Sequence, residues 1–336
     1  MNKKHVFIIA ELSANHNNDF ELAVKTIKAI AESGADAVKI QTYKPESLTL
    51  NLDTGPFAPR TEGLWKGYTP WTLYEEASMP YKWQPELKRI AEDLGLIFFS
   101  SPFDKEGVDF LESMNVSLYK VASMEITDIP LIQYIASKGK PLIISTGAAE
   151  LADIELALKS CKEMGNNHIT LLKCTAEYPA PINKANLLTI PNLKETFGVE
   201  VGVSDHTMGS TVPIVSVALG ATVVEKHFIL DRSLGGPDSA FSMEPHEFKA
   251  MVQAVREAEV ALGKITYDVS EQSKMKRRSL FVVEDIKAGE KITENNIKSI
   301  RPGDGLHPKY FKAILGKVAN QDLKKGTPTN FALFSE

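Results

Sequence analysis

The chain has 336 residues, of which 43% are hydrophobic and 24% charged, a composition typical of a water-soluble globular protein. Its net charge of −5 argues against a nucleic-acid-binding protein, and no stretch approaches the roughly 20 apolar residues of a membrane span. The two cysteines exclude a disulfide framework, and the opening run MNKKHVFIIAE has too short an apolar core for a signal peptide, so we expect a cytoplasmic protein.

Eight short β-rich runs recur along the chain, and most of the stretches between them have helical spacing. In the first such stretch, Leu22, Ile27 and Ile30 form an apolar stripe. Asp19 can cap the start of this helix, and Gly34 can end it. The eight runs comprise residues 6–10, 36–41, 96–100, 117–123, 140–146, 169–174, 200–205 and 221–227.

Apolar strands that alternate with helices indicate a parallel sheet covered by helices. Eight such units, the last followed by a helical stretch over residues 244–263, predict an α/β protein with a (β/α)₈ TIM barrel. The alternative is an open doubly wound sheet. The count of eight and the lack of a GxGxxG turn after the first run favour the barrel.

One connection is much longer than the others. Roughly 40 residues separate Gln41 from the helix expected near Trp83, and they are rich in Gly, Pro and aromatic residues. A loop of this length can be a lid or a wall of a binding site, or it can be a contact between subunits. The sequence leaves these interpretations open.

The pattern changes after the barrel. We expect the catalytic domain to span residues 1–265 and a polar, basic linker to span residues 266–279. Residues 280–336 contain short strands and turns, which predict a second domain of about 55 residues with a marginal core. Such a domain needs a docking surface, and the barrel of a partner chain is a candidate.

Polar residues stand at the ends of all eight predicted strands. Barrel enzymes place their chemistry at these carboxyl ends. Strand ends also meet water in any barrel, but two histidines together with Lys39, Lys120 and Lys173 at one rim exceed what contact with water requires. The strand-end residues are Glu11, Lys39, Gln41, Ser100, Ser101, Lys120, Ser123, Ser145, Thr146, Lys173, Thr175, Asp205, His206, Glu225, Lys226 and His227.

His206 and His227 end the seventh and eighth strands, which are neighbours about 4.8 Å apart in a closed barrel. Two imidazoles at this separation can chelate one divalent metal ion, although a single histidine here would more often be structural. Without a thiolate ligand, Mn²⁺ is favoured, with Mg²⁺ or Co²⁺ as alternatives. Asp205 and Glu225 are then expected to accept hydrogen bonds from the imidazoles.

A cationic, hydroxyl-rich cluster is expected on the opposite arc of the rim. Such a cluster suits a small molecule that carries both a phosphate and a carboxylate. Each lysine could instead form a buried ion pair, and Lys120 or Lys173 could form a Schiff base. A neighbouring metal argues against the Schiff base. The cluster comprises Lys39, Lys120, Lys173, Ser101, Ser123 and Ser145.

Ordered motifs along the chain resemble those of the sialic acid synthase family. They are IIAELSANHNND, GADAVKIQTY, SSPFD, YKVAS, IISTG, LLKCTAEYP, VGVSDHTMG, VVEKHF and GPDSAFSM. Residues 280–336 resemble the antifreeze-like (SAF) domain, a β-clip fold, that completes these enzymes. The resemblance implies condensation of phosphoenolpyruvate with an N-acylated amino sugar to a nine-carbon 2-keto acid and phosphate.

The resemblance also implies roles for individual residues. His206 and His227 would hold the metal, and the residues around phosphoenolpyruvate would be Lys39, Ser101, Lys120, Ser123, Ser145 and Lys173. The sugar or the reacting water would lie near Glu11, Gln41, Glu125, Tyr178 and Asp238. Glu11 or Glu125 would carry the proton. Arg301 would reach the acceptor in the opposite subunit of a domain-swapped homodimer.

Two segments, ELSANHN and GLWKGYTPWTLYEEASMPYKW, resemble the branch of this family that uses a 6-deoxy diacetamido sugar. Asn17-Asn18 and Ala176 stand where neuraminate-forming members typically have Asn-Gly and an asparagine. A neuraminate- or legionaminate-forming enzyme is the alternative. A lysine-imine aldolase and a carbohydrate- or ice-binding protein are rivals from other classes.

Overall fold

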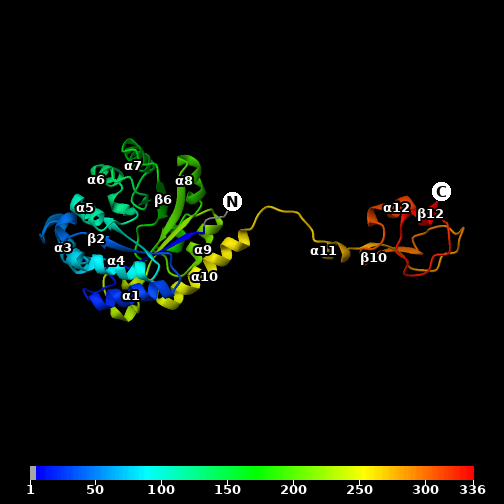
Figure 1. Cartoon of the computed structure of the whole chain (residues 1–336), viewed down its shortest axis with the longest axis horizontal. Coiled ribbons are helices and arrows are strands. Elements are labelled where there is room, and N and C mark those ends of the chain that lie inside the picture. The colour runs from blue at the N-terminus through cyan, green and yellow to red at the C-terminus, as the bar shows by residue number, and fades with distance from the viewer. Residues whose placement is uncertain (1–4) are drawn as a thin grey trace. The chain divides into compact units, whose positions relative to one another are not determined.

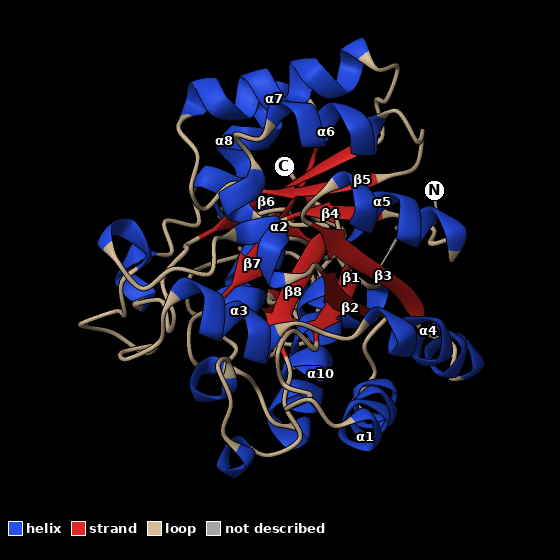
Figure 2. Ribbon diagram, turned by 90° about the vertical axis from the view of Figure 1, so that its left-hand side faces the viewer, coloured by secondary structure: helices blue, strands red, loops and turns tan. Residues whose placement is uncertain are grey.

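The structure, a computed structural model, describes residues 5–336, so the first four residues of the opening run lie outside the described part. The chain forms two units, one ending at Gly263 and the other beginning at Lys264 (Figure 1). Within the described part of the first unit, eight parallel strands pair in chain order, and the eighth pairs with the first. Figure 2 shows these strands enclosed by helices. The predicted closed barrel is confirmed, and the open sheet is excluded.

The strands begin and end within about two residues of their predicted bounds. They are β1 (Phe7–Glu11), β2 (Ala37–Thr42), β3 (Ile97–Pro102), β4 (Tyr119–Val121), β5 (Leu142–Ser145), β6 (Ile169–Cys174), β7 (Glu200–Asp205) and β8 (Val223–His227). The covering helices are α1 (Phe20–Glu32), α4 (Gln84–Asp93), α5 (Lys105–Ser113), α6 (Ile129–Ala136), α7 (Leu151–Glu163), α8 (Thr189–Phe197), α9 (Thr211–Ala218) and α10 (Pro245–Leu262).

Local hydrogen bonds explain where the first helix begins. The Asp19 carboxylate accepts hydrogen bonds from the backbone N–H groups of Glu21 and Leu22 at 2.8 and 3.2 Å, which caps α1 as predicted. Removing a cap of this kind costs about 1 kcal/mol of stability.

Polar contacts also fasten α10 to the amino-terminal ends of the first two strands. Arg256 donates to the Val6 carbonyl at 2.6 Å and to Asp36 at 2.7 Å. Glu259 accepts from the Val6 backbone N–H at 2.6 Å. This end of a barrel commonly serves stability, whereas the opposite end carries the chemistry.

Strand alternation sorts the barrel side chains into two layers. The cluster inside the barrel comprises Ile9, Ala37, Phe99, Leu118, Ile143, Leu172 and Val223. Because successive residues point to opposite faces of a strand, residues two positions further on face the same interior. These residues are Glu11, Lys39, Ser101, Lys120, Ser145, Cys174 and Glu225. The apolar interior therefore supports a polar layer at the carboxyl ends of the strands.

The long connection after β2 is folded rather than structureless. It contains α2 (Pro45–Leu48) and α3 (Pro70–Ala77), with 3₁₀ turns at Gly55–Phe57 and Tyr81–Trp83. The Thr69 side chain accepts a hydrogen bond from the Thr72 backbone N–H at 3.1 Å and caps α3. Residues of this connection line the cavity described below, which favours a site wall among its possible roles.

The second unit has its own small core. Its elements are α11 (Glu271–Met275), β9 (Ser279–Val282), β10 (Ile297–Ile300), α12 (Phe311–Ile314), β11 (Val318–Ala319) and β12 (Phe334–Ser335). Two antiparallel pairs form, β9 with β10 and β11 with β12. The core comprises Leu280, Val282, Ile286, Ile292, Ile297, Ile314, Ala319, Leu323, Leu333 and Phe334. Of the helices described between residues 5 and 336, none has the length and apolar character needed to cross a membrane.

Candidate active site

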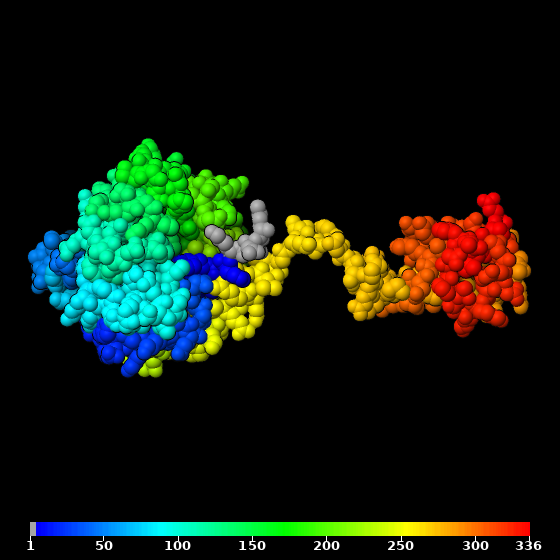
Figure 3. Space-filling view, viewed as in Figure 1, coloured from blue at the N-terminus to red at the C-terminus, as the bar shows by residue number. Residues whose placement is uncertain are grey.

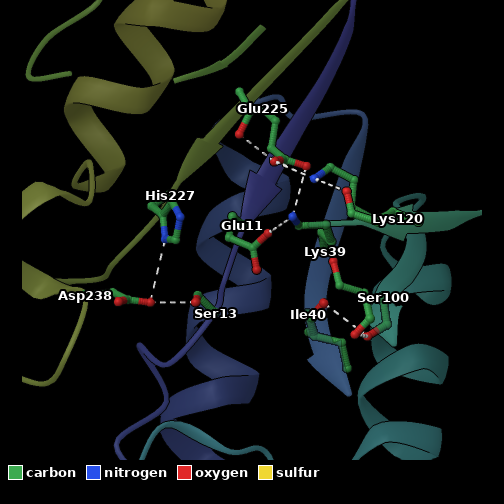
Figure 4. A network of polar contacts seen from close by, with 12 residues as sticks. Glu11, Ser13, Lys39, Ile40, Ser100, Lys120, Glu225, His227 and Asp238 are labelled. Atoms are coloured by element: carbon green, nitrogen blue, oxygen red, sulfur yellow. Dashed lines mark hydrogen bonds and ion pairs between the residues drawn. The ribbon is translucent and has the colours of Figure 1, made fainter. Parts of the chain in front are cut away.

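Four buried side chains at the carboxyl ends of the strands form a charged floor, defined here as Glu11, Lys39, Lys120 and Glu225 (Figure 4). The Lys39 Nζ atom contacts Glu11 and lies 3.0 Å from Oε2 of Glu225. The Lys120 Nζ atom lies 3.6 Å from Oε1 of the same Glu225 carboxylate. Ser204 donates to this carboxylate at 2.8 Å. Glu225 therefore holds two lysines from different strands beside each other.

The charged floor keeps hydrogen-bond donors available. An ammonium group has three N–H donors. Lys39 forms ion pairs with Glu11 and Glu225. Lys120 donates one hydrogen bond, to the Val121 carbonyl at 3.2 Å, and forms a longer ion pair with Glu225. Burial lowers the pKa of Lys39 to about 8, while the charge of Glu225 opposes this shift. Each lysine keeps at least one donor for an anionic ligand.

The structure does not bring Lys173 to this floor. Its Nζ atom donates to the Cys174 carbonyl at 3.0 Å and to the Thr175 hydroxyl at 2.9 Å. Strand alternation turns Lys173 away from the interior, where Cys174 lies 3.8 Å from His206. The expected grouping of three lysines is therefore corrected to two. Cys174 was not predicted as a site residue, because the run ITLLKC is apolar on both faces and its pattern does not show which face turns inward.

His206 and His227 do approach each other, as expected from neighbouring strands. Their ring centroids are 5.3 Å apart. The Nδ1 atom of His206 lies 3.0 Å from the Thr175 carbonyl, which fixes the tautomer and leaves Nε2 as the atom with a free lone pair. The Nδ1 atom of His227 lies 3.8 Å from the Asp238 carboxylate, which accepts a 2.5 Å hydrogen bond from Ser13 (Figure 4).

One member of this pair, His227, has features that fit a ligand of a divalent metal with open coordination positions. Metal-binding imidazoles must be neutral. Burial holds the pKa of His227 well below its ordinary value, and the Nδ1 atom of this residue is buried without a hydrogen-bond partner. Among residues 5–336, no group of three or more His, Cys, Asp and Glu side chains is arranged to hold a metal. A metal here would take the two imidazoles and complete its coordination with water or substrate.

The expected carboxylate partners of the imidazoles are elsewhere engaged. Asp205 lies 2.5 Å from the Nζ atom of Lys226, which also donates to the Thr207 carbonyl at 2.5 Å. Asp205 and Lys226 occupy the outer face of their strands, because each directly neighbours an inward-facing residue. Glu225 binds the lysines of the charged floor. Asp205 and Glu225 therefore do not orient the imidazoles, whereas Asp238 faces one of them.

A cavity of about 400 Å³ opens above the strand ends. Its lining includes six of the predicted residues, namely Gln41, Ser123, Glu125, Tyr178, His227 and Asp238. The connection after β2 contributes Leu48, Arg60, Trp65, Leu73, Tyr74 and Ala77. These latter residues were not predicted individually, because they are divided between two short helices and the loops around them, and no long periodic pattern indicates their direction.

Several polar atoms near the strand ends are buried without a hydrogen-bond partner among the described residues. They include Ser101 Oγ, Ser145 Oγ, Glu125 Oε2 and His227 Nδ1. Such orphaned atoms are costly in a folded protein and mark positions where a ligand or water binds. Ser123 differs, because its Oγ atom accepts from the Gly147 backbone N–H at 3.1 Å. A Cβ atom at residue 147 would come within 2.8 Å of this hydroxyl, so glycine is needed there.

Glu125 has the properties of a proton carrier. It ends a 3₁₀ turn, Ser123–Glu125, that follows β4, and it lines the cavity. Burial raises its pKa to about 7. A carboxyl group with this pKa exchanges protons readily near neutral pH. Glu11, the other carboxylate predicted to carry the proton, contacts Lys39 and belongs to the charged floor.

Arg301 belongs to the second unit, directly after β10, and its side chain is exposed. The structure describes this unit by itself, so the expected placement of Arg301 over an acceptor stays a prediction.

Fold and site together define an enzyme of the transferase type, built on a TIM barrel and followed by a small β domain. The chain belongs to the NeuB family, whose pattern matches residues 26–267, and residues 277–329 match the SAF domain. The family resemblance drawn from the motifs is confirmed.

Relatives of known function cover nearly the whole chain. The pseudaminic acid synthase of Helicobacter pylori is 48% identical over 325 residues, covering 96% of this chain and 95% of that protein. The pseudaminic acid synthase of Campylobacter jejuni is also 48% identical, with the same coverage of both chains. Among solved structures, the spore coat polysaccharide biosynthesis protein spsE of Bacillus subtilis has 34% identity and a TM-score of 0.68, covering 99% of this chain and 96% of that one.

Proposed function

We propose that this chain is a pseudaminic acid synthase, which condenses phosphoenolpyruvate with 2,4-diacetamido-2,4,6-trideoxy-L-altrose. The observation that carries the proposal is the 48% identity to two pseudaminic acid synthases over both units of the chain. The charged floor and the cavity above it supply the binding functions that this reaction needs.

The charged floor is proposed to bind phosphoenolpyruvate. At least one N–H donor of Lys39 and one of Lys120 remain for the phosphate and carboxylate oxygens. The hydroxyl groups of Ser101 and Ser145 are buried without partners and can donate to the same ligand. Charged donors fixed in a buried site stabilise a leaving phosphate without having to reorganise.

The acceptor sugar is proposed to occupy the cavity, with its aldehyde toward His227. A divalent metal held by His206 and His227, Mn²⁺ in our proposal, supplies Lewis-acid polarisation of this aldehyde when bound. Asp238, fixed by Ser13, lies beside His227 and can accept a hydrogen bond from a sugar hydroxyl. The cavity thus brings the two reactants together, which removes most of the entropic cost of their meeting.

Carbon 3 of phosphoenolpyruvate forms the new bond to the aldehyde carbon, and water adds to carbon 2. Phosphate then leaves with its bridging oxygen, so that C–O cleavage yields a nine-carbon 2-keto acid and phosphate. Glu125 is our candidate to accept the proton from the attacking water, because its pKa is about 7 and its Oε2 atom has no partner. Glu11 is the alternative.

A homodimer in which the small domain of one chain covers the barrel mouth of the other is part of the proposal. Large apolar side chains are exposed in the segments that follow the barrel strands, and a covering domain would remove them from water. They are Leu50, Leu52, Leu64, Met124, Ile182, Leu188, Met208 and Leu234. Arg301 would then reach the acceptor from the partner chain.

We place the reaction in the cytoplasm. Cys161 and Cys174 are buried and free, which suits a reducing compartment.

The proposal is tested by incubating the purified protein with phosphoenolpyruvate, Mn²⁺ and one of several sugars, and by measuring phosphate release. The diacetamido trideoxy sugar should give the highest kcat/KM. N-acetylmannosamine and the acceptor for diacetyllegionaminate serve as alternatives. A higher kcat/KM with either would replace the proposed acceptor with that of a neuraminate or legionaminate synthase.

A further inference from the structure

Arg60 lies in a closed loop within the connection after β2. Its backbone N–H donates to the Tyr68 carbonyl at 2.9 Å, and its carbonyl accepts from the Gly67 N–H at 2.8 Å. Gly67 has a φ of +91°, a conformation that favours glycine. Figure 3 shows the surrounding segment at the left edge of the barrel unit, in blue. The backbone of Arg60 is therefore fixed on both sides.

Trp65 fixes the side chain of Arg60 relative to the barrel. The Arg60 guanidinium carbon lies 5.0 Å from the Trp65 ring centroid. The indole N–H donates to the Pro237 carbonyl at 2.8 Å, and the ring centroid lies 5.6 Å from that of Tyr178. Pro237 and Tyr178 belong to the segments after β8 and β6. Arg60 is thus held against two other parts of the barrel rim.

Arg60 lines the cavity, and its guanidinium has unused hydrogen-bond donors. It is the only Lys or Arg among the described residues that line the cavity, and no hydrogen bond or ion pair joins its side chain to another residue between 5 and 336. A guanidinium group carries five N–H donors. Burial raises the pKa of the Tyr74 hydroxyl. The positive charge of Arg60 opposes this shift, and the negative charge of Glu125 adds to it.

Apolar and acidic groups around the same cavity narrow the ligand that Arg60 can bind. Tyr43, Leu48, Leu73 and Phe103 give the cavity an apolar wall. Glu125 and Asp238, which also line it, disfavour a second anion there. The wall and the guanidinium together suit a neutral acyl-amino group, whose carbonyl oxygen accepts a hydrogen bond and whose methyl group packs on apolar carbon.

We propose that Arg60, held by Trp65, determines acceptor specificity by donating to the carbonyl of the acyl-amino group remote from the aldehyde. This inference rests on the proposed function, because that function places the aldehyde near His227 at the strand ends. Arg60 comes from the connection after β2 and lines the same cavity as His227. In this proposal, an acceptor with an acyl-amino group at its fourth carbon extends from His227 to Arg60.

The test compares two acceptors with the same 6-deoxy ring, one with acetamido groups at carbons 2 and 4 and one with a hydroxyl at carbon 4. In wild-type enzyme the first should have the higher kcat/KM. Arg60→Ala should lower kcat/KM for the first by about 10- to 100-fold, because the site loses a hydrogen bond that the second acceptor never makes. The KM for phosphoenolpyruvate and the kcat/KM of the second acceptor should change less than about twofold.

Two further substitutions at residue 60 identify the group that is bound. Arg60→Gln keeps neutral donors and should restore part of the preference for the diacetamido acceptor. Arg60→Lys keeps the charge but not the planar fork. Full rescue by Lys together with no rescue by Gln would show that an anion is bound, and would overturn the inference.

Lys66 provides a matched control on the same loop. It is exposed and lies beside Asn18, Tyr68 and Glu75, outside the cavity. Lys66→Ala should leave both kcat/KM values unchanged, and circular dichroism should show that all variants fold.

The inference and the proposed function can fail separately. If wild-type enzyme does not turn over the diacetamido acceptor, the proposed function fails and the inference fails with it. If wild-type enzyme is active but Arg60→Ala keeps the wild-type ratio between the two acceptors, the inference alone is overturned.

Discussion

The Nζ atom of Lys39 lies 3.0 Å from Oε2 of Glu225, and both side chains are buried inside the barrel. Because Lys120 approaches the same carboxylate, Glu225 is the charge that allows two lysines to be buried side by side. Although burial opposes its ionisation, Lys120 and Lys39 lower the pKa of Glu225. Glu225 is therefore the one carboxylate of the charged floor that both lysines approach.

Glu225→Gln should destabilise the fold as well as abolish activity. It preserves the side-chain shape but leaves Lys120 without its carboxylate, and breaking a buried ion pair in this way costs about 3–5 kcal/mol. Urea unfolding followed by circular dichroism measures the change. Glu86→Gln, which removes an exposed partner of Arg89, is the control and should leave stability nearly unchanged. Equal stability of wild type and Glu225→Gln would contradict the role given to this carboxylate.

The opposite orientations of Lys39 and Lys173 predict different effects of the same substitution. Lys39→Met should reduce kcat/KM for phosphoenolpyruvate by at least about 100-fold, because it removes a charge-assisted hydrogen bond to the substrate. Lys173→Met should reduce it by less than about tenfold, because Lys173 faces the outer layer and bonds to Cys174 and Thr175. Steady-state kinetics with varied phosphoenolpyruvate distinguish the two. If both substitutions reduce kcat/KM for phosphoenolpyruvate equally, Lys173 also belongs to the phosphoenolpyruvate site.

Glu125 should give activity an acid limb near pH 7. Its folded-state pKa of about 7 exceeds its ordinary value of 4.5, so the carboxylate needed as a base is lost as pH falls through 7. Glu125→Gln should lower kcat by about 100- to 10,000-fold and remove this limb from the pH profile. If the acid limb persists in Glu125→Gln, the residue that accepts the proton would be Glu11 instead.

The same raised pKa has a consequence for stability. Folding takes up a proton at Glu125 between pH 4.5 and about 7. Its stabilising contribution is therefore present below pH 4.5 and is lost as pH rises through about 7. Relative to Glu125→Gln, the wild-type protein should become less stable across this interval, which thermal unfolding at several pH values measures.

His206→Ala should remove metal binding while leaving the fold intact. His206 and His227 are the two ligands of the proposed metal site, and the loss of one leaves a single imidazole. Isothermal titration with Mn²⁺ measures binding directly, and activity should fall to background. The exposed His246 provides the control, because His246→Ala should change neither Mn²⁺ binding nor activity. If the His206→Ala protein stays active and EDTA still inhibits it, a metal binds without His206, which would contradict the proposed site.

Arg301 is predicted to act on the barrel of the partner chain. Arg301→Ala should raise the KM for the sugar more than the KM for phosphoenolpyruvate. Mixing this variant with His206→Ala should restore activity, because a mixed dimer contains one intact barrel facing one intact small domain. Absence of recovery after verified subunit exchange would indicate that Arg301 acts within its own chain or not at all.

The sequence allowed the fold and much of the site to be predicted, because both follow from periodic patterns. Apolar runs of β character and helical stripes such as Leu22, Ile27 and Ile30 repeat eight times and define the barrel. Once the strands are placed, the position of polar residues at their carboxyl ends follows. This is why His206 and His227 could be paired before the structure was known.

Other parts of the site could not be predicted, because they depend on side-chain direction and on irregular structure. The run ITLLKC is apolar on both faces, so its pattern does not tell whether Lys173 or Cys174 points inward. The partner of Glu225 depends on the register of neighbouring strands. Arg60 lies in a connection without periodicity, and its place in the cavity arises from backbone hydrogen bonds and from contact with Trp65.

The most direct test of the proposed condensation uses phosphoenolpyruvate that carries heavy oxygen in the bridging position. The protein is incubated with this substrate, Mn²⁺ and the diacetamido trideoxy sugar, and both products are analysed by mass spectrometry. Our account predicts a nine-carbon 2-keto acid without the label and phosphate that retains it. Label in the keto acid, or phosphate release without a new carbon–carbon bond, would contradict the account.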